Sequence, residues 1–98
     1  MGKELQKKIQ ILQIHKDHLE EKFYIKKIAI FGSFAVGKQK QGSDIDIMIE
    51  LHQPIGFFKF LEMEEMLAHL LGRRVDLVTK KALKPAIKKT VLKEAIYV

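Results

Sequence analysis

The chain has 98 residues, of which 47% are apolar, so it is long enough for one domain around a single core. It contains no cysteine, which excludes disulfides, thiolate zinc sites and a cysteine nucleophile. No apolar run approaches the roughly 20 residues of a membrane span, and no secretory h-region follows the charged N-terminus, so we expect a cytoplasmic protein without a membrane partner.

The net charge of +6 is concentrated near the C-terminus. Residues 80–98 hold six lysines, and Glu94 is the only acidic residue among them. Such a basic segment could contact RNA, a nucleotide phosphate or an acidic protein face, or it could be a solvated helix face. We expect residues 80–98 to dock a protein partner.

The first half of the chain predicts a helix, a strand and a short turn. Residues 3–21 read as an amphipathic helix, because apolar residues recur at helical spacing at Leu5, Ile9, Leu12 and Leu19. Residues 25–31 form an apolar β-rich run that Gly32 stops. One short helical turn over residues 33–38 and a polar loop up to Ser43 are expected next.

The second half predicts two strands and two helices. Residues 44–51 alternate between isoleucines that should be buried and polar residues on the other face. A helix should end at Gly72, residues 73–78 form a strand, and Pro85 suits the first turn of a last helix, whose apolar stripe is Leu83, Ile87 and Val91. We therefore predict one α/β domain over residues 1–98, ordered α-β-α-β-α-β-α, with a small mixed three-stranded sheet flanked by helices.

Three aspartates stand at positions that predict metal-assisted phosphoryl or nucleotidyl transfer. Asp44 and Asp46 share one face of a strand, about 6–7 Å apart, and can both reach a pair of Mg²⁺ ions. Asp76 on a neighbouring strand could complete the site or act as a base. The same period places Arg74 on that face, where it could pair with a carboxylate or a phosphate.

Gly32 and Ser33 supply the second half of the predicted site. Glycine permits a sharp turn and a close approach of the backbone to a ligand. Ser33 then begins a short helix, whose free N–H groups suit phosphate oxygens. The turn is not a Walker loop, because no Gly-Lys-Ser/Thr follows it.

These motifs resemble the DNA polymerase β-like nucleotidyltransferase superfamily and, in the string from Phe31 to Ile47, its minimal nucleotidyltransferases. The resemblance covers almost the whole chain and implies a polymerase β palm-like fold. It implies that Asp44, Asp46 and Asp76 are catalytic metal ligands and that Gly32 and Ser33 bind the nucleotide. It further implies two Mg²⁺ ions, ATP as substrate and a helical HEPN-domain partner, with this chain as an antitoxin that transfers AMP to a partner hydroxyl.

Two other functions stay open at this point. The chain could be a non-catalytic antitoxin that binds nucleotide and partner and acts by occlusion. It could also be a basic RNA-binding protein with incidental aspartates, which we do not favour. The residues do not specify the base, the acceptor or the oligomeric state, and a homo-oligomer stays open. Phe57, Phe58 and Phe60 could stack a base, with core packing as the alternative.

Overall fold

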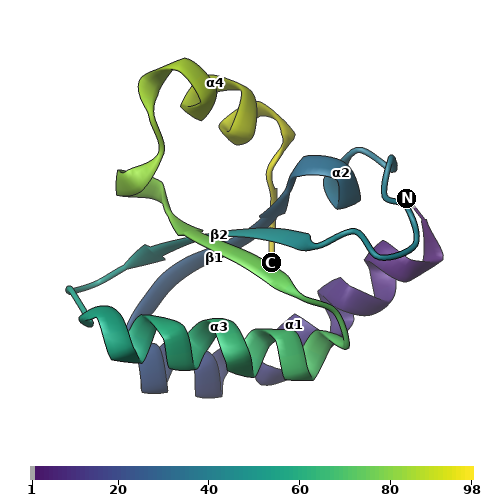
Figure 1. The fold of residues 1–98 in the computed structure, drawn as a ribbon. Helices are drawn as coiled ribbons and strands as arrows, with labels where there is room; N and C mark the ends of the chain where they lie inside the picture. Colours follow the sequence, from purple (N-terminus) through teal and green to yellow (C-terminus); the bar gives the residue numbers. More distant parts are fainter. Residues whose placement is uncertain (1) are drawn as a thin grey trace.

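The computed structural model describes residues 2–98 as a mixed sheet between two layers of helices (Figure 1). The elements in chain order are α1 (Lys3–Phe23), β1 (Ile25–Phe31), α2 (Gly32–Ala35), β2 (Ile45–Leu51), α3 (Phe57–Leu71), β3 (Val75–Thr79), the 3₁₀ turn η1 (Lys80–Ala82), α4 (Pro85–Glu94) and β4 (Ile96–Tyr97). The predicted α/β class and the order of helices and strands are confirmed. Within residues 2–98 no helix is both long and apolar enough to cross a bilayer.

The sheet has four strands in the order β3-β2-β1-β4, so the prediction of three strands was wrong. β1 pairs antiparallel with both β2 and β4, whereas β2 pairs parallel with β3. β4 holds only Ile96 and Tyr97, which pair with Ile30 and Ala29. Two residues are too few to show the alternation by which a strand is recognised in a sequence, and only the tertiary pairing with β1 reveals it.

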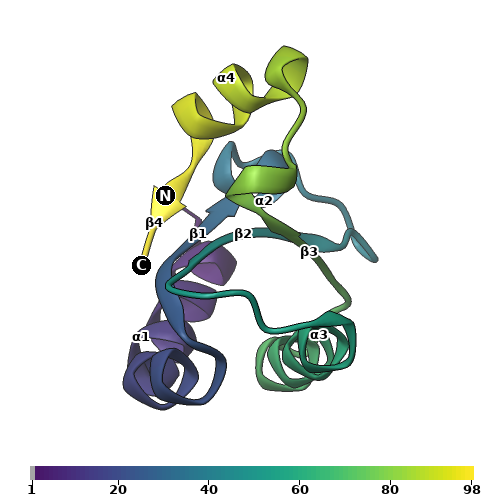
Figure 2. The same cartoon turned by 90° about the vertical axis from the view of Figure 1, so that its left-hand side faces the viewer.

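α1 and α3 lie side by side under one face of the sheet, and α2 and α4 lie on the other (Figures 1 and 2). β2 has an apolar face towards α1 and α3, and a single apolar residue between two charged ones on its other face. The predicted isoleucines Ile45, Ile47 and Ile49 are buried in the main core with α1 and α3. On the opposite face Met48 is also buried, in a second cluster with Ala29, Leu83 and Val91.

The last helix departs from its predicted apolar stripe. Leu83 and Val91 are buried against the sheet, but Ile87 is 52% exposed. The second cluster is small and α4 touches the sheet mainly through its C-terminal half, so the first turn of α4 stands clear of the core. The expected stop of α3 is confirmed, because Gly72 adopts φ 68° and its N–H donates to the Ala68 carbonyl at 2.9 Å.

Arg73 joins parts of the chain that are far apart in sequence. Its guanidinium donates to both carboxylate oxygens of Glu4, at 2.7 and 3.2 Å, and to the Ser43 carbonyl at 3.0 Å. It also lies over the Phe34 ring, 4.9 Å from the centroid. The hydrogen bond from Arg73 holds the pKa of Glu4 below its usual value. One side chain thus ties the first turn of α1 to α2 and to the loop that enters β2.

We predict that Arg73→Lys lowers the melting temperature by about 5 °C, because lysine is a point charge that cannot make the forked contact or the planar stack. Arg74→Lys is the matched control, since the Arg74 side chain is 85% exposed and an exposed ion pair adds little stability. Thermal unfolding followed by circular dichroism measures both. Equal melting temperatures for the two variants would contradict a linking role for Arg73.

Candidate functional site

The register of β2 and β3 brings two of the predicted aspartates together. Asp46 pairs directly with Asp76 across the parallel strands, which places their backbones about 4.8 Å apart. Both residues alternate with buried neighbours that face α1 and α3, so both side chains point to the opposite face of the sheet. Two carboxylates that meet on one face, with a third from Asp44 just before β2, form the acidic end of the candidate site.

Gly32 lies against the Asp46 carboxylate. Phe31 pairs with Asp46 across β1 and β2, and Gly32 follows at the point where β1 passes into α2. A Cβ built on Gly32 would overlap the Asp46 carboxylate, and the backbone φ of +71° also disfavours any side chain. The turn predicted to hold phosphates therefore touches the predicted metal ligand, with Ser33 directly after it.

Arg74 pairs with Asp44 through an Nε to Oδ1 distance of 3.2 Å. The strand period had left open whether Arg74 pairs with a carboxylate or a phosphate, and here its partner is the carboxylate of Asp44. The Asp44 side chain is 43% exposed and that of Arg74 is 85% exposed, so the pair adds little to stability and exchanges readily for other partners. Arg74 is thus placed at the rim of the acidic end, where it offsets part of the negative charge.

The environment of Asp46 raises its pKa above the usual value. Burial is the main cause, and the charges of Asp76 and then Asp44 add to it. Each of these causes disfavours the ionised carboxylate. A cation bound among the three side chains would remove the repulsion and restore the charge.

The donor set fits Mg²⁺, which prefers carboxylate and phosphate oxygens and keeps several water ligands. Among residues 2–98, no three His, Cys, Asp or Glu side chains are arranged to enclose a metal ion by themselves. A Mg²⁺ ion held here by one or two carboxylates would need further ligands from substrate phosphates, as in many enzymes that act on nucleotides.

The phenylalanines considered for base stacking do not lie at the acidic end. Phe57 and Phe58 begin α3, which follows the opposite end of β2, and they are 68% and 83% exposed. Phe60 packs against the main core instead. Arg73 is the residue near the site that the sequence did not reveal, because its partner Glu4 lies 69 positions away and no local spacing links them.

Comparison with known proteins identifies the family. A family model described as a nucleotidyltransferase domain matches residues 12–98, which is most of the chain. The chain belongs to the nucleotidyltransferase family. A protein adenylyltransferase named MntA from Thermococcus cleftensis is 48% identical over 88 residues, which are 90% of this chain and 89% of the relative. A protein of Methanocaldococcus jannaschii assigned to the same activity is 47% identical over 90 residues. The predicted enzyme class, nucleotidyltransferase, is confirmed.

Solved structures share the fold. A structure assigned to a minimal nucleotidyltransferase aligns with a TM-score of 0.71 and 27% identity, over 93% of this chain and 88% of that chain. A toxin–antitoxin complex with AMP-PNP aligns with a TM-score of 0.71 and 24% identity, over 95% and 70% of the two chains. A complex of a tri-AMPylated Shewanella oneidensis HEPN toxin with an MNT antitoxin aligns with a TM-score of 0.66 and 20% identity, over 96% and 70%. The resemblance to minimal nucleotidyltransferases is confirmed.

We predict that Gly32→Ala destabilises the protein more than Gly37→Ala does. Both glycines have a left-handed backbone, with φ of +71° and +74°, but only at position 32 would the new Cβ meet another group. Gly37→Ala should cost about 1–2 kcal/mol of unfolding free energy through the backbone alone, and Gly32→Ala about 1–3 kcal/mol more through the overlap. Urea unfolding measures both. Equal losses would mean that the Asp46 carboxylate moves away freely.

We predict that Asp46→Asn melts about 2–5 °C higher than the parent in EDTA at pH 7. The folded pKa of Asp46 is raised, so between its unfolded and folded pKa the folded state binds more protons and stability falls as the pH rises. The loss of stability caused by the Asp46 charge is complete above the folded pKa and absent below the ordinary value of 3.8. The higher melting temperature of Asp46→Asn should therefore vanish on acidification.

Asp17→Asn is the control for this measurement, because Asp17 is an exposed residue of α1 far from the site. Mg²⁺ should raise the melting temperature of the parent and of Asp17→Asn but not of Asp46→Asn. A lower melting point of Asp46→Asn in EDTA would show instead that internal hydrogen bonds hold the aspartate in place.

Proposed function

We propose that the chain, acting as one domain over residues 1–98, transfers AMP from ATP to a hydroxyl group of a partner protein in the presence of Mg²⁺. The observation that carries this proposal is the pairing of Asp46 with Asp76 beside the Gly32 turn. Metal-dependent nucleotidyl transfer needs carboxylates next to a phosphate-binding turn, and this end of the sheet supplies both. The adenylyltransferase names of relatives at 47–48% identity support ATP as the nucleotide.

Each residue has a role that follows from its position. Gly32 lets the chain turn sharply beside Asp46, where backbone N–H groups could meet phosphate oxygens, and Ser33 adds a hydroxyl donor. Asp44, Asp46 and Asp76 would hold the Mg²⁺ ions. When bound, Mg²⁺ neutralises phosphate charge and makes a nearby hydroxyl more acidic. Arg74 can leave Asp44 and pair with a phosphate, because it is exposed and weakly held.

The reaction balances without any further reactant. The acceptor oxygen attacks the α-phosphorus of ATP, the bond between that phosphorus and the bridging oxygen to the β-phosphate breaks, and pyrophosphate leaves. The acceptor proton passes to the Asp76 carboxylate and then to solvent. Asp76 suits this task because its strand position exposes it on the site face, whereas Asp46 is half-buried.

The acceptor that we propose is a helical HEPN-domain protein, which the chain would neutralise as an antitoxin. Support comes from the solved relatives, one of which is an MNT antitoxin in complex with an AMPylated HEPN toxin. We propose that the transfer takes place in the cytoplasm, where ATP is available. The binding of two Mg²⁺ ions is part of the same proposal.

The test combines binding with transfer. We predict that ATP affinity measured by calorimetry rises on addition of Mg²⁺, and that Asp44→Asn with Asp46→Asn abolishes this rise. Mixing the parent with ATP, Mg²⁺ and its HEPN-domain partner should add AMP to that partner, as seen by intact mass spectrometry. The double variant should add none, and Asp17→Asn should act like the parent.

Two results would contradict parts of the proposal. ATP affinity that is unchanged by Mg²⁺ and by the double variant would remove the metal-nucleotide site. If the double variant neutralises the HEPN protein without adding AMP to it, the chain acts by occlusion instead.

A further inference from the structure

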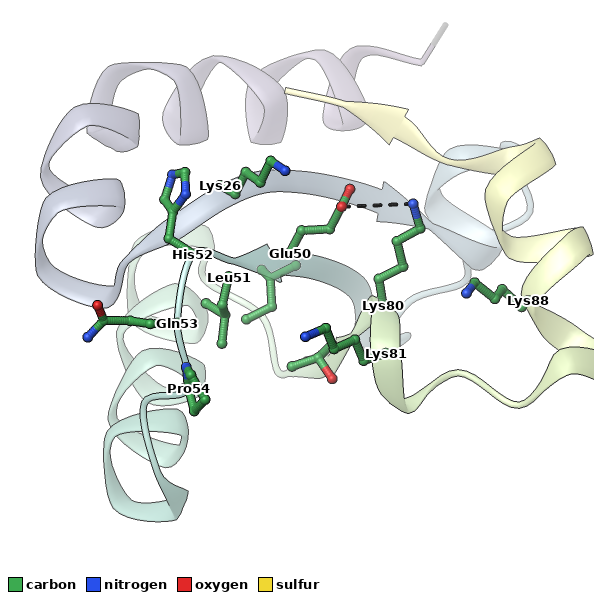
Figure 3. A pocket seen from close by; sticks show the side chains of 11 residues that line it. Lys26, Glu50, Leu51, His52, Gln53, Pro54, Lys80, Lys81 and Lys88 are labelled. Carbon is green, nitrogen blue, oxygen red and sulfur yellow. Dashed lines mark ion pairs between the residues drawn. The ribbon is translucent and has the colours of Figure 1, made fainter.

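A hollow on the surface lies at the other end of β2 from the aspartates. It is a cleft of about 580 Å³ between the end of β2, the loop at residues 52–54, η1 and α4 (Figure 3). Its ionisable lining residues come from β1, β2, the loop, η1 and α4, and they are Lys26, Glu50, His52, Lys80, Lys81 and Lys88. The volume is that of a typical small-molecule site. We call this hollow the lysine cleft.

The lysine cleft is separate from the acidic end. Asp46 and Glu50 lie on the same face of β2 but four residues apart, which is about 13 Å along a strand. Met48 stands between them and is 1% exposed, because Leu83 and Val91 cover it. A wall of packed side chains thus divides the two ends of this face, and a ligand at the aspartates cannot extend into the lysine cleft through it.

Positive charge in the lysine cleft is not balanced by the protein. Glu50 is the only acidic lining residue, and it already pairs with Lys80 at 3.8 Å. Lys26, Lys81 and Lys88 have no carboxylate partner within residues 2–98. Three unpaired ammonium groups around one hollow repel one another, and an anion with several charges would relieve that repulsion.

We propose that the lysine cleft binds a compact anion with two or more phosphate groups, either free or carried by a nucleotide. Lysine is a common point-charge ligand for phosphate, and here it approaches one hollow from β1, η1 and α4. A solvated helix face or an extended polymer track would not need this convergence. The other lysines of the C-terminal segment, Lys84, Lys89 and Lys93, do not line the cleft.

The proposal does not depend on catalysis, and its test is run without metal. The probe is inorganic tripolyphosphate, titrated by calorimetry into the full chain in EDTA, with ATP as a second probe. One tripolyphosphate should bind per chain. Lys81→Gln with Lys88→Gln should weaken binding about a hundredfold, because each of the two lost charged contacts is worth about tenfold.

The matched control is Lys84→Gln with Lys89→Gln, which removes the same charge from the same region outside the cleft. Its affinity for tripolyphosphate should stay close to that of the parent, apart from a small effect of net charge. Glu50→Gln should strengthen binding, because it removes the one negative charge of the lining. ATP that binds more weakly than tripolyphosphate would identify the free anion as the preferred source, and tighter ATP binding would identify a nucleotide.

Four results would overturn the proposal. Equal weakening by the two lysine pairs would mean diffuse surface attraction. If Asp44→Asn with Asp46→Asn weakens tripolyphosphate binding as much as the cleft pair does, the anion binds at the acidic end. If tripolyphosphate does not bind but an acidic polypeptide does, or single-stranded RNA binds more tightly as its length grows, the lysines bind a macromolecule instead. No binding of any probe would leave no anion site at all.

Discussion

The parallel pairing of β2 with β3 is the constraint on which the acidic end depends. It sets Asp46 opposite Asp76, while the antiparallel pairing with β1 sets Asp46 opposite Phe31 and against Gly32. A slip of one residue in either ladder would turn the Asp46 side chain into the apolar core. The register is secured by the isoleucines of β2, whose burial leaves only one way for the strand to face.

β2 is central in the sheet and in the charge distribution. On the face of β2 turned away from α1 and α3, Met48 is buried with Leu83 and Val91 and closes the middle of the strand. One end gathers carboxylates and the other gathers lysines. The wall between them keeps opposite charges about 13 Å apart instead of letting them neutralise each other. Both charged ends therefore remain available for ligands of opposite sign.

The sequence was most informative where the signal was local. The alternation from Asp44 to Leu51, Gly32 after an apolar run and Gly72 after a helical pattern each carry their structural meaning within a few residues. What it could not reveal depends on distant partners. β4 is a strand only because it pairs with β1, Arg73 depends on Glu4 and Phe34, and the lysine cleft forms only where six segments meet. The exposure of Ile87 follows from where α4 leaves the sheet, which no helical period records.

The short strand β4 also protects the protein against edge-to-edge aggregation. Without Ile96 and Tyr97, β1 would be an outer strand that presents unpaired backbone groups beside the apolar residues Ala29 and Ile30. An exposed strand of this kind can recruit a strand from another molecule. Because β4 is held to β1 by only this short pairing, opening of β4 would bare that edge. Conditions that loosen β4 are therefore those in which this protein is most exposed to aggregation.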